Sequence, residues 1–113
     1  MVTNSKILVA GGSGFIGSNL ISELISKGNK VVCLSKNYIK FEKRIKSVNY
    51  IEHDLRHPIK KNELKNFSDI EYIINCSGYI NHNNFQVDGK EIFNSHFEII
   101  YNLIDLALIL KPV

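Results

Sequence analysis

Glycines near the start of the chain have the spacing of a loop that binds phosphate groups. Gly11, Gly14 and Gly17 are three residues apart, and Gly12, Gly14 and Gly17 also satisfy G-x-G-x-x-G. In such a loop the first glycine allows a sharp turn, the second lets the backbone approach a pyrophosphate, and the third lets helix and strand pack closely. The spacing predicts a dinucleotide site, and the alternative is a glycine-rich turn without a ligand.

The segments on either side of these glycines are those that such a site requires. Ile7, Leu8 and Val9 form an apolar run without polar alternation, which is typical of a central parallel strand covered on both faces. After the glycines, apolar residues recur at helical spacing, and Lys27 and Gly28 mark a helix end. One helix face is predicted to contain Ile16, Leu20, Ile21, Leu24 and Ile25. The amides at the start of this helix would bind an anion without a basic side chain.

Composition sets limits on size and environment. The chain has 113 residues, 44% of them hydrophobic, and a formal net charge of +3, so one domain or part of one is expected. The lysines are scattered between apolar runs and give no electrostatic footprint for nucleic acid. No signal peptide or membrane-spanning stretch is present, and Cys33 and Cys76 lack disulfide or metal spacing. We expect a cytoplasmic protein that binds neither nucleic acid nor membranes.

The second strand is predicted at Lys30–Leu34, and the residues after it bear on cofactor choice. In NAD sites an Asp or Glu about 20 residues beyond the glycines accepts hydrogen bonds from the adenosine ribose, whereas NADP sites supply a cation. Here the strand ends in Ser35-Lys36-Asn37, without a carboxylate. We therefore predict NADP(H) in preference to NAD(H), with a 2′-phosphate bound by Lys36 and by the nearby cations Lys40, Lys43 and Arg44. The alternative is that the cations of residues 38–46 form a solvated helix face.

A third strand is predicted at Val48–Glu52, followed by Asp54 and Leu55 at the carboxyl edge of the sheet, where ligands collect. Asp54 could accept a hydrogen bond from the adenine amino group, and Leu55 could flank the ring. The alternative for Asp54 is a helix or turn cap before Pro58. His53 and His57 define no metal site and are predicted to lie at the surface.

A fourth strand is predicted at Tyr72–Cys76, and the small residues Ser77 and Gly78 end it close to the phosphate or ribose of a cofactor. A polar loop over residues 78–89 and a long helix over residues 90–108 follow. The main apolar stripe of this helix is expected to consist of Phe93, Phe97, Ile100, Ile104 and Leu108, and further apolar residues widen it.

This order of elements predicts an α/β fold, namely the first, adenosine-binding half of a Rossmann-like doubly wound parallel sheet. The chain stops where a fifth strand would begin, so residues 1–113 are expected to be the N-terminal portion of a longer dinucleotide-binding domain. The last helix is too apolar for this half alone to bury. A missing C-terminal part or a second copy of the chain, in a homodimer, is expected to cover it.

Several segments together resemble a known family. Ala10-Gly11-Gly12-Ser13-Gly14-Phe15-Ile16-Gly17 closely resembles the T-G-x-x-G-x-x-G signature of extended short-chain dehydrogenases/reductases, the NAD-dependent epimerase/dehydratase family. His53-Asp54-Leu55 resembles the adenine-contacting step of that family, and Asn102-Leu103-Ile104 resembles the end of its N-x-x-G-T-x-N-L-L helix. The resemblance implies cofactor contacts from Gly11, Gly14, Phe15, Ile16, Gly17, Ser35, Lys36, Asp54, Leu55, Cys76, Ser77 and Gly78.

The sequence also departs from the family pattern. Ala10 stands where Thr is usual, and Ser35 stands where NAD-using members often have Asp. In the register set by Asn102, His96 replaces the helix Asn, while Ile99 and Ile100 replace Gly-Thr. These changes leave the predicted cofactor site in place.

No catalytic residue is predicted in the chain. Family members use Tyr-x-x-x-Lys as general acid/base, and none of the five tyrosines here has Lys four residues on. In the family that motif and the substrate contacts lie beyond residue 113. The resemblance implies the NAD(P)-binding part of an epimerase, dehydratase or reductase that transfers hydride on a nucleotide sugar or related carbonyl/alcohol substrate. The alternative is a non-catalytic module that senses NADP(H).

Overall fold

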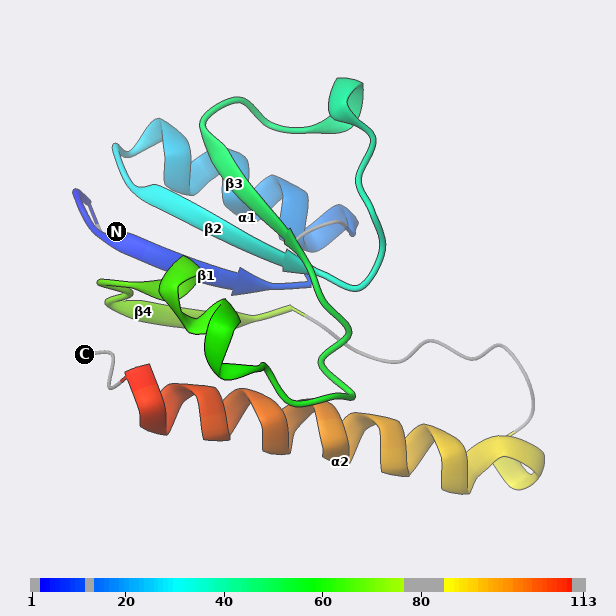
Figure 1. Ribbon diagram of the computed structural model, residues 1–113. Coiled ribbons are helices and arrows are strands. Elements are labelled where there is room, and N and C mark those ends of the chain that lie inside the picture. Colours follow the sequence, from blue (N-terminus) through cyan, green and yellow to red (C-terminus); the bar gives the residue numbers. More distant parts are fainter. Residues whose placement is uncertain (1–2, 12–13, 77–84, 111–113) are drawn as a thin grey trace.

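The computed structural model describes residues 3–11, 14–76 and 85–110, with side chains of the last segment described from residue 98 onward. Strands and helices alternate along the chain, and two of the connections contain 3-10 helices (Figure 1). The elements are β1 (Lys6–Ala10), α1 (Phe15–Ser26), β2 (Lys30–Ser35), η1 (Phe41–Lys43), β3 (Val48–Glu52), η2 (Lys61–Phe67), β4 (Tyr72–Asn75) and α2 (Phe85–Leu110).

The four strands form one parallel sheet in the order β3-β2-β1-β4. β1 is a central strand, and its last residue, Ala10, is in register with Leu34 of β2 and Asn75 of β4. The carboxyl ends of these three strands therefore lie side by side, at the edge where ligands bind in open α/β sheets. The predicted α/β, Rossmann-like architecture is confirmed.

The two faces of the sheet are covered by different elements (Figure 1). On one face, Ile21 and Leu24 of α1 pack against Ile7, Val9, Val31 and Cys33. On the other face, α2 and the η2 segment pack against alternate residues of the same strands. This second cluster contains Leu8, Ala10, Val32, Leu34, Leu55, Phe67, Ile70, Ile99, Leu103 and Leu106. Burial on both faces explains why β1 and β2 are continuous apolar runs.

Two glycines hold the backbone conformations that the sequence predicts. Gly11 has a φ of 77° at the turn out of β1, and Gly28 has a φ of 84° directly after the end of α1. Both values lie in the left-handed region, which costs a residue with a β-carbon about 1 kcal/mol or more. The sharp turn after β1 and the glycine stop of α1 are therefore confirmed.

Several predicted bounds are wrong. α2 begins at Phe85 instead of residue 90, so the expected loop over residues 78–89 includes the start of a helix. Gly89 lies inside that helix, where a glycine costs only about 1 kcal/mol and does not end it. The segment 38–46, for which a helix was the alternative interpretation, contains only the three-residue η1. Ile16 is 74% exposed, because it lies in the first turn of α1, beyond the edge of the sheet.

The face of α2 that packs on the sheet also differs from the expected main stripe. Ile99, Leu103 and Leu106 are buried, whereas Ile100, Ile104 and Leu108 are at least half exposed. The helix is apolar on most sides, so its periodicity did not select one face. Among the described helices, none is both long and apolar enough to cross a membrane.

The docking of α2 can be tested with one substitution made on its two faces. Leu106 is 2% exposed and Leu108 is 70% exposed. We expect Leu106→Ala to lower the free energy of unfolding by about 2–4 kcal/mol, because it leaves a cavity in the core. Leu108→Ala should change it by less than about 0.5 kcal/mol. Urea unfolding followed by circular dichroism measures both values, and equal losses would contradict the docked face of α2.

Candidate functional site

Gly11 and Gly14 flank the connection between β1 and α1. Gly11 donates its backbone N–H to the carbonyl of Leu34 at 2.7 Å, which ties the turn to the end of β2. Gly14 is the N-cap residue of α1, and among the described residues no side chain caps the helix there; the first turn contains no acidic residue. A β-carbon added at Gly14 would meet no atom of the described residues within 4 Å. No described residue therefore obstructs the backbone of Gly14 at the positive end of a helix dipole, an environment that suits a pyrophosphate.

The residues after Gly14 divide between the site and the core. Phe15 is 85% exposed and, like Ile16, lies in the first turn of α1. Gly17 is buried on the side of α1 that faces the sheet, as expected for the glycine that permits close helix–strand packing. Gly12 and Ser13 lie outside the described residues.

The end of β2 is fixed to the end of β3. Ser35 is buried, its hydroxyl donates to the carbonyl of Asn37 at 2.9 Å, and its own carbonyl accepts the N–H of His53 at 2.8 Å. Lys36, the next residue, is exposed. The predicted ribose position therefore consists of a hydroxyl held by the backbone, followed by an exposed cation.

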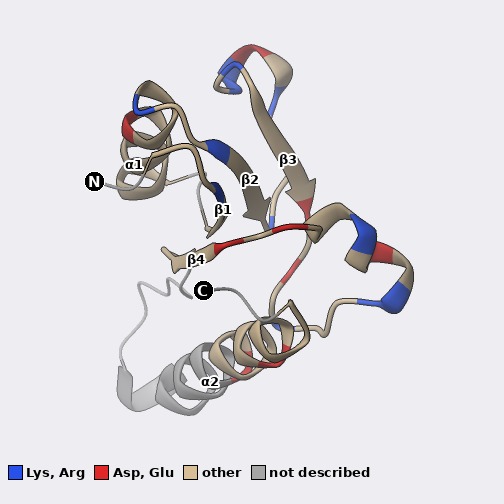
Figure 2. Ribbon diagram, turned by 90° about the vertical axis from the view of Figure 1, so that its left-hand side faces the viewer, with Lys and Arg blue, Asp and Glu red and all other residues tan. Residues whose placement is uncertain are grey.

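A cavity of about 290 Å³ lies between α1 and the loop that follows β2. Lys40 and Lys43 contribute cationic side chains to its lining, which consists of Ser18, Tyr38, Ile39, Lys40, Lys43, Ile45 and Tyr50. The charged residues of η1 and η2 lie on connections outside the sheet (Figure 2).

Arg44 braces the loop beside this cavity. Its guanidinium carbon lies 5.1 Å from the ring centroid of Tyr38 and 5.3 Å from that of Tyr50, distances typical of cation–π contacts. Its Nε donates to the carbonyl of Ile39 at 2.9 Å. Of the four cations predicted to meet a 2′-phosphate, Arg44 therefore has a clear structural role.

Asp54, the predicted adenine contact, forms a bidentate ion pair with Arg56. The Nη2 atom of Arg56 lies 2.7 Å from Oδ2, and its Nε lies 3.1 Å from Oδ1 and 3.0 Å from Oδ2. Oδ1 also accepts the backbone N–H of Arg56 at 2.9 Å, and the carbonyl of Asp54 accepts the N–H of His57 at 2.9 Å. Asp54 thus caps a turn before Pro58, which was the alternative interpretation of this residue.

This environment stabilises the charged form of Asp54. Hydrogen bonds from the Arg56 side chain lower the pKa of Asp54 from its ordinary value of 3.8 to about 2. Partial burial opposes this change, while the backbone hydrogen bond and the positive charges of Arg56 and Lys36 reinforce it. The carboxylate is ionised throughout the physiological pH range.

The neighbouring residue, Leu55, is held from two sides. Its side chain is buried in the cluster under α2, and its carbonyl accepts a hydrogen bond from Nδ2 of Asn102 on α2 at 2.7 Å. On the other side of the turn, Nε2 of His53 lies 2.8 Å from the carbonyl of His57. The Asp54-Leu55 step is thus fixed before any ligand arrives, with only a small part of the Leu55 side chain exposed.

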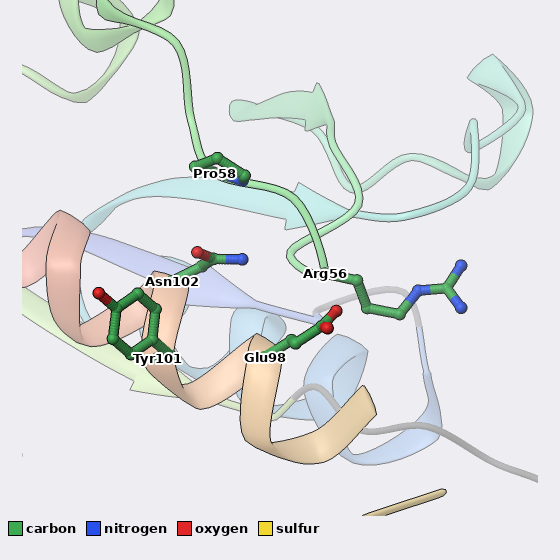
Figure 3. Close-up of a pocket in the computed structure, with 5 residues that line it drawn as sticks. All are labelled: Arg56, Pro58, Glu98, Tyr101 and Asn102. Atoms are coloured by element: carbon green, nitrogen blue, oxygen red, sulfur yellow. The ribbon is translucent and has the colours of Figure 1, made fainter. Parts of the chain in front are cut away.

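A second cavity, of about 270 Å³, lies where this loop meets α2. Its lining consists of Arg56, Pro58, Glu98, Tyr101 and Asn102. Glu98 points from α2 toward the loop, while the guanidinium of Arg56 extends away from the helix (Figure 3). Arg56 therefore links this cavity to the Asp54 carboxylate.

The predicted site residues at the fourth strand are only partly described. Cys76 follows β4, is half-buried, and donates its N–H to the carbonyl of Ala10 at 2.7 Å, which places it beside the glycine turn. Ser77 and Gly78 lie outside the described residues. Within the described part of the chain, no group of three or more His, Cys, Asp or Glu side chains could hold a metal ion.

Sequence reasoning missed two residues of this site. The pairing of Arg56 with Asp54 has a local signal, because an Asp two residues before the bonded N–H is typical of a side-chain-capped turn. Asn102 also has a signal, since it is a polar residue one helical turn from Ile99 and Leu106 on the buried face of α2. Both roles depend on contacts that spacing alone does not reveal.

Comparisons with known proteins agree with this geometry. Residues 7–113 match the sequence model of the NAD dependent epimerase/dehydratase family. A UDP-glucose 4-epimerase from Klebsiella pneumoniae is 34% identical over 82 residues, which cover 65% of this chain and 58% of that protein.

Solved structures show the same fold. The crystal structure of a UDP-glucose 4-epimerase superimposes with a TM-score of 0.80 at 18% identity, covering 95% of this chain and 33% of that one. A short-chain dehydrogenase from Leptospira borgpetersenii with bound NAD+ gives a TM-score of 0.69 at 25% identity, covering 92% of this chain and 43% of that one. The chain thus spans less than two thirds of these relatives.

The ion pair of Asp54 predicts how stability responds to acid. A lowered folded-state pKa adds stability that is complete above pH 3.8 and is lost as the pH falls toward about 2. We expect Asp54→Asn to cost about 1 kcal/mol at pH 7, a value reduced for solvent screening. Asparagine keeps the oxygen that accepts the Arg56 N–H, so the turn should remain.

Urea unfolding of both proteins between pH 7 and pH 2 tests this expectation. The difference between wild type and Asp54→Asn should shrink below about pH 4. Asp105→Asn, on an exposed position of α2, is the control for loss of one negative charge. A difference that stays constant down to pH 2 would contradict a stabilising ion pair at Asp54.

Proposed function

The chain belongs to the NAD dependent epimerase/dehydratase family, and we propose that it forms the cofactor-binding part of an enzyme that transfers hydride on a nucleotide sugar or a related carbonyl/alcohol substrate. The family and the similarity to a UDP-glucose 4-epimerase support a sugar-modifying enzyme that uses a nicotinamide dinucleotide. The observation that carries the proposal is that no described side chain caps α1 at Gly14 and that no described atom lies within 4 Å of a β-carbon added there.

Each part of the dinucleotide has a counterpart in the proposed site. The glycine turn, with Gly11, Gly14 and the first amides of α1, would hold the pyrophosphate, and the exposed Phe15 and Ile16 would border it. Asp54 would accept from the adenine amino group through the acceptor capacity that remains beside the three N–H groups of Arg56, next to Leu55. When bound, the nicotinamide ring supplies the hydride acceptor or donor.

The residues after β4 would complete the site on the other side of the turn. The backbone contact of Cys76 with Ala10 supports a position for Cys76, Ser77 and Gly78 near the phosphate or ribose of the cofactor. We propose that a fifth strand, the substrate contacts and the catalytic residues belong to a further C-terminal part. The chain's coverage of only about a third of a solved UDP-glucose 4-epimerase supports this division.

Within this site we propose NADP(H) in preference to NAD(H). Ser35 stands at the ribose position without a carboxylate, and its hydroxyl is bonded to Asn37. Lys36 is exposed directly beyond it, and the cavity lined by Lys40 and Lys43 lies on the same loop. Lysines bind phosphate through charge-assisted hydrogen bonds.

A non-catalytic module that senses NADP(H) is the second candidate function. It stands beside the enzyme because residues 1–113 contain the predicted cofactor contacts, while in the family the Tyr-x-x-x-Lys pair lies beyond residue 113. Both candidates use the same cofactor site. A Tyr-x-x-x-Lys pair in a longer form of the protein would favour the enzyme.

We also propose that α2 takes part in self-association. Its outer face presents Ile100, Tyr101, Ile104, Leu108 and Ile109, each at least half exposed, and such a patch is typical of an interface. Among the described residues Cys33 and Cys76 form no disulfide, which supports a cytoplasmic location.

The glycine turn is tested by Gly14→Val. Gly14 has a φ of −78°, which valine adopts readily, and space for its β-carbon is free. We therefore expect the fold to tolerate the change, while the added side chain blocks the pyrophosphate and weakens NADPH binding at least about a hundredfold. Isothermal titration calorimetry measures the affinity, and thermal unfolding checks the fold.

Ser22→Val is the matched control, because it adds a similar side chain at an exposed position of α1 away from the turn. It should leave NADPH affinity unchanged. If Gly14→Val bound NADPH as tightly as wild type, the glycine turn would not be the pyrophosphate site.

Cofactor preference is tested by comparing NADPH with NADH for wild type and Lys36→Gln. We expect wild type to bind NADPH more tightly, and the variant to lose about three- to tenfold in NADPH affinity with little change for NADH. Lys65→Gln, at an exposed position of η2, is the control for loss of one positive charge. Tighter NADH binding by wild type would contradict the preference and would point to Glu52, which pairs with Ser35 across the sheet, as the ribose acceptor.

A further inference from the structure

A carboxylate stands beside the proposed 2′-phosphate position, where its charge opposes such a ligand. The ends of β2 and β3 are adjacent, since Ser35 is in register with Glu52 and accepts the N–H of His53. Lys36 and Asp54 are the next residues on these two segments. Lys36 is near enough for its charge to help lower the pKa of Asp54. An unpaired carboxylate at Asp54 would attract Lys36 and would repel a phosphate dianion.

Arg56 forms an ion pair with the Asp54 carboxylate. Its guanidinium contacts both oxygens of Asp54 at 2.7–3.1 Å, a bidentate geometry that lysine does not reproduce. The backbone N–H of Arg56 bonds the same carboxylate, so the turn itself holds the pair together. The guanidinium extends away from α2, beyond Glu98, which is the carboxylate that α2 presents to the loop (Figure 3).

We propose that Arg56 is a specificity-determining residue for the cofactor, because it neutralises Asp54 and thereby leaves Lys36 available to the 2′-phosphate of NADP(H). The inference rests on the proposed NADP(H) preference. In this arrangement Arg56 acts through Asp54 and Lys36, and it needs no contact with the phosphate. Without Arg56, Asp54 would be open to pairing with Lys36, and these two residues together would then offer the phosphate no net positive charge.

A purely structural role for Arg56 makes a different prediction. If Arg56 only closed the turn, its loss would weaken NADPH and NADH binding by the same factor. A neutralising role changes the ratio of the two affinities, because only NADPH carries the additional phosphate. The ratio is also expected to depend on Asp54, since the proposed effect of removing Arg56 is the exposure of that carboxylate.

The experiment is a double-mutant cycle on the purified chain, with NADPH and NADH titrated by calorimetry at low ionic strength. We expect Arg56→Gln to lower the NADPH-to-NADH affinity ratio about three- to tenfold. Asp54→Asn combined with Arg56→Gln should restore the ratio to within about twofold of wild type, because neither charge remains. Arg56→Lys should keep most of the ratio, and Lys65→Gln, at an exposed position of η2, should leave it unchanged.

The outcomes separate this inference from the proposed function. An unchanged ratio in Arg56→Gln, or no recovery in the double variant, would overturn the role of Arg56 while leaving the proposed function in place. Tighter NADH binding by wild type, with the ratio still lowered by Arg56→Gln, would overturn the NADP(H) preference and support the role of Arg56. No binding of either cofactor by wild type would overturn both. Addition of 0.5 M salt should reduce the effect of Arg56→Gln, because the interaction is electrostatic.

Discussion

The rest of the structure depends on the burial of β1 on both faces. Its apolar side chains contact α1 on one side and the η2–α2 layer on the other, and its backbone pairs with β2 and β4. A strand enclosed in this way is fixed in direction and register. Gly11 and Gly14, which follow it along the chain, are therefore placed at the carboxyl edge of the sheet by a rigid support.

The ends of β2 and β3 differ from the glycine turn in where their charge comes from. The glycine turn relies on backbone amides and carries no charged side chain in its helix turn, whereas the ends of β2 and β3 bring Lys36, Asp54 and Arg56 together. Backbone dipoles suit the pyrophosphate that all dinucleotides share. Charged side chains suit the 2′-phosphate position, by which NADP(H) differs from NAD(H), because a single substitution can add or remove such a charge.

α2 has one buried face and one exposed face. One face contributes Leu103 and Leu106 to the core, and Asn102 on the same side bonds the carbonyl of Leu55. The opposite face is apolar and exposed. Asn102 thus joins α2 to the Asp54-Leu55 step, and it also lines the cavity beside Arg56.

The sequence by itself determined the parts of this protein that follow from local patterns. The apolar runs at residues 7–9, 31–34 and 72–74 have no helical spacing and mark strands, and the glycines at 11, 14 and 17 mark a turn into a helix. Each of these signals lies within a few neighbouring residues. They were therefore sufficient to predict the Rossmann-like fold, the glycine turn and the position of Asp54 after β3.

Only the tertiary structure decided which groups meet. The buried face of α2 is chosen by the shape of the sheet, because the helix is apolar on most sides. The contact of Asn102 with Leu55 joins residues 47 positions apart, and the engagement of Arg44 between Tyr38 and Tyr50 depends on how the loop folds back. Even the local pairing of Arg56 with Asp54 needs a turn geometry that spacing permits but does not impose. Contacts of this kind follow from packing the whole chain, which no short pattern encodes.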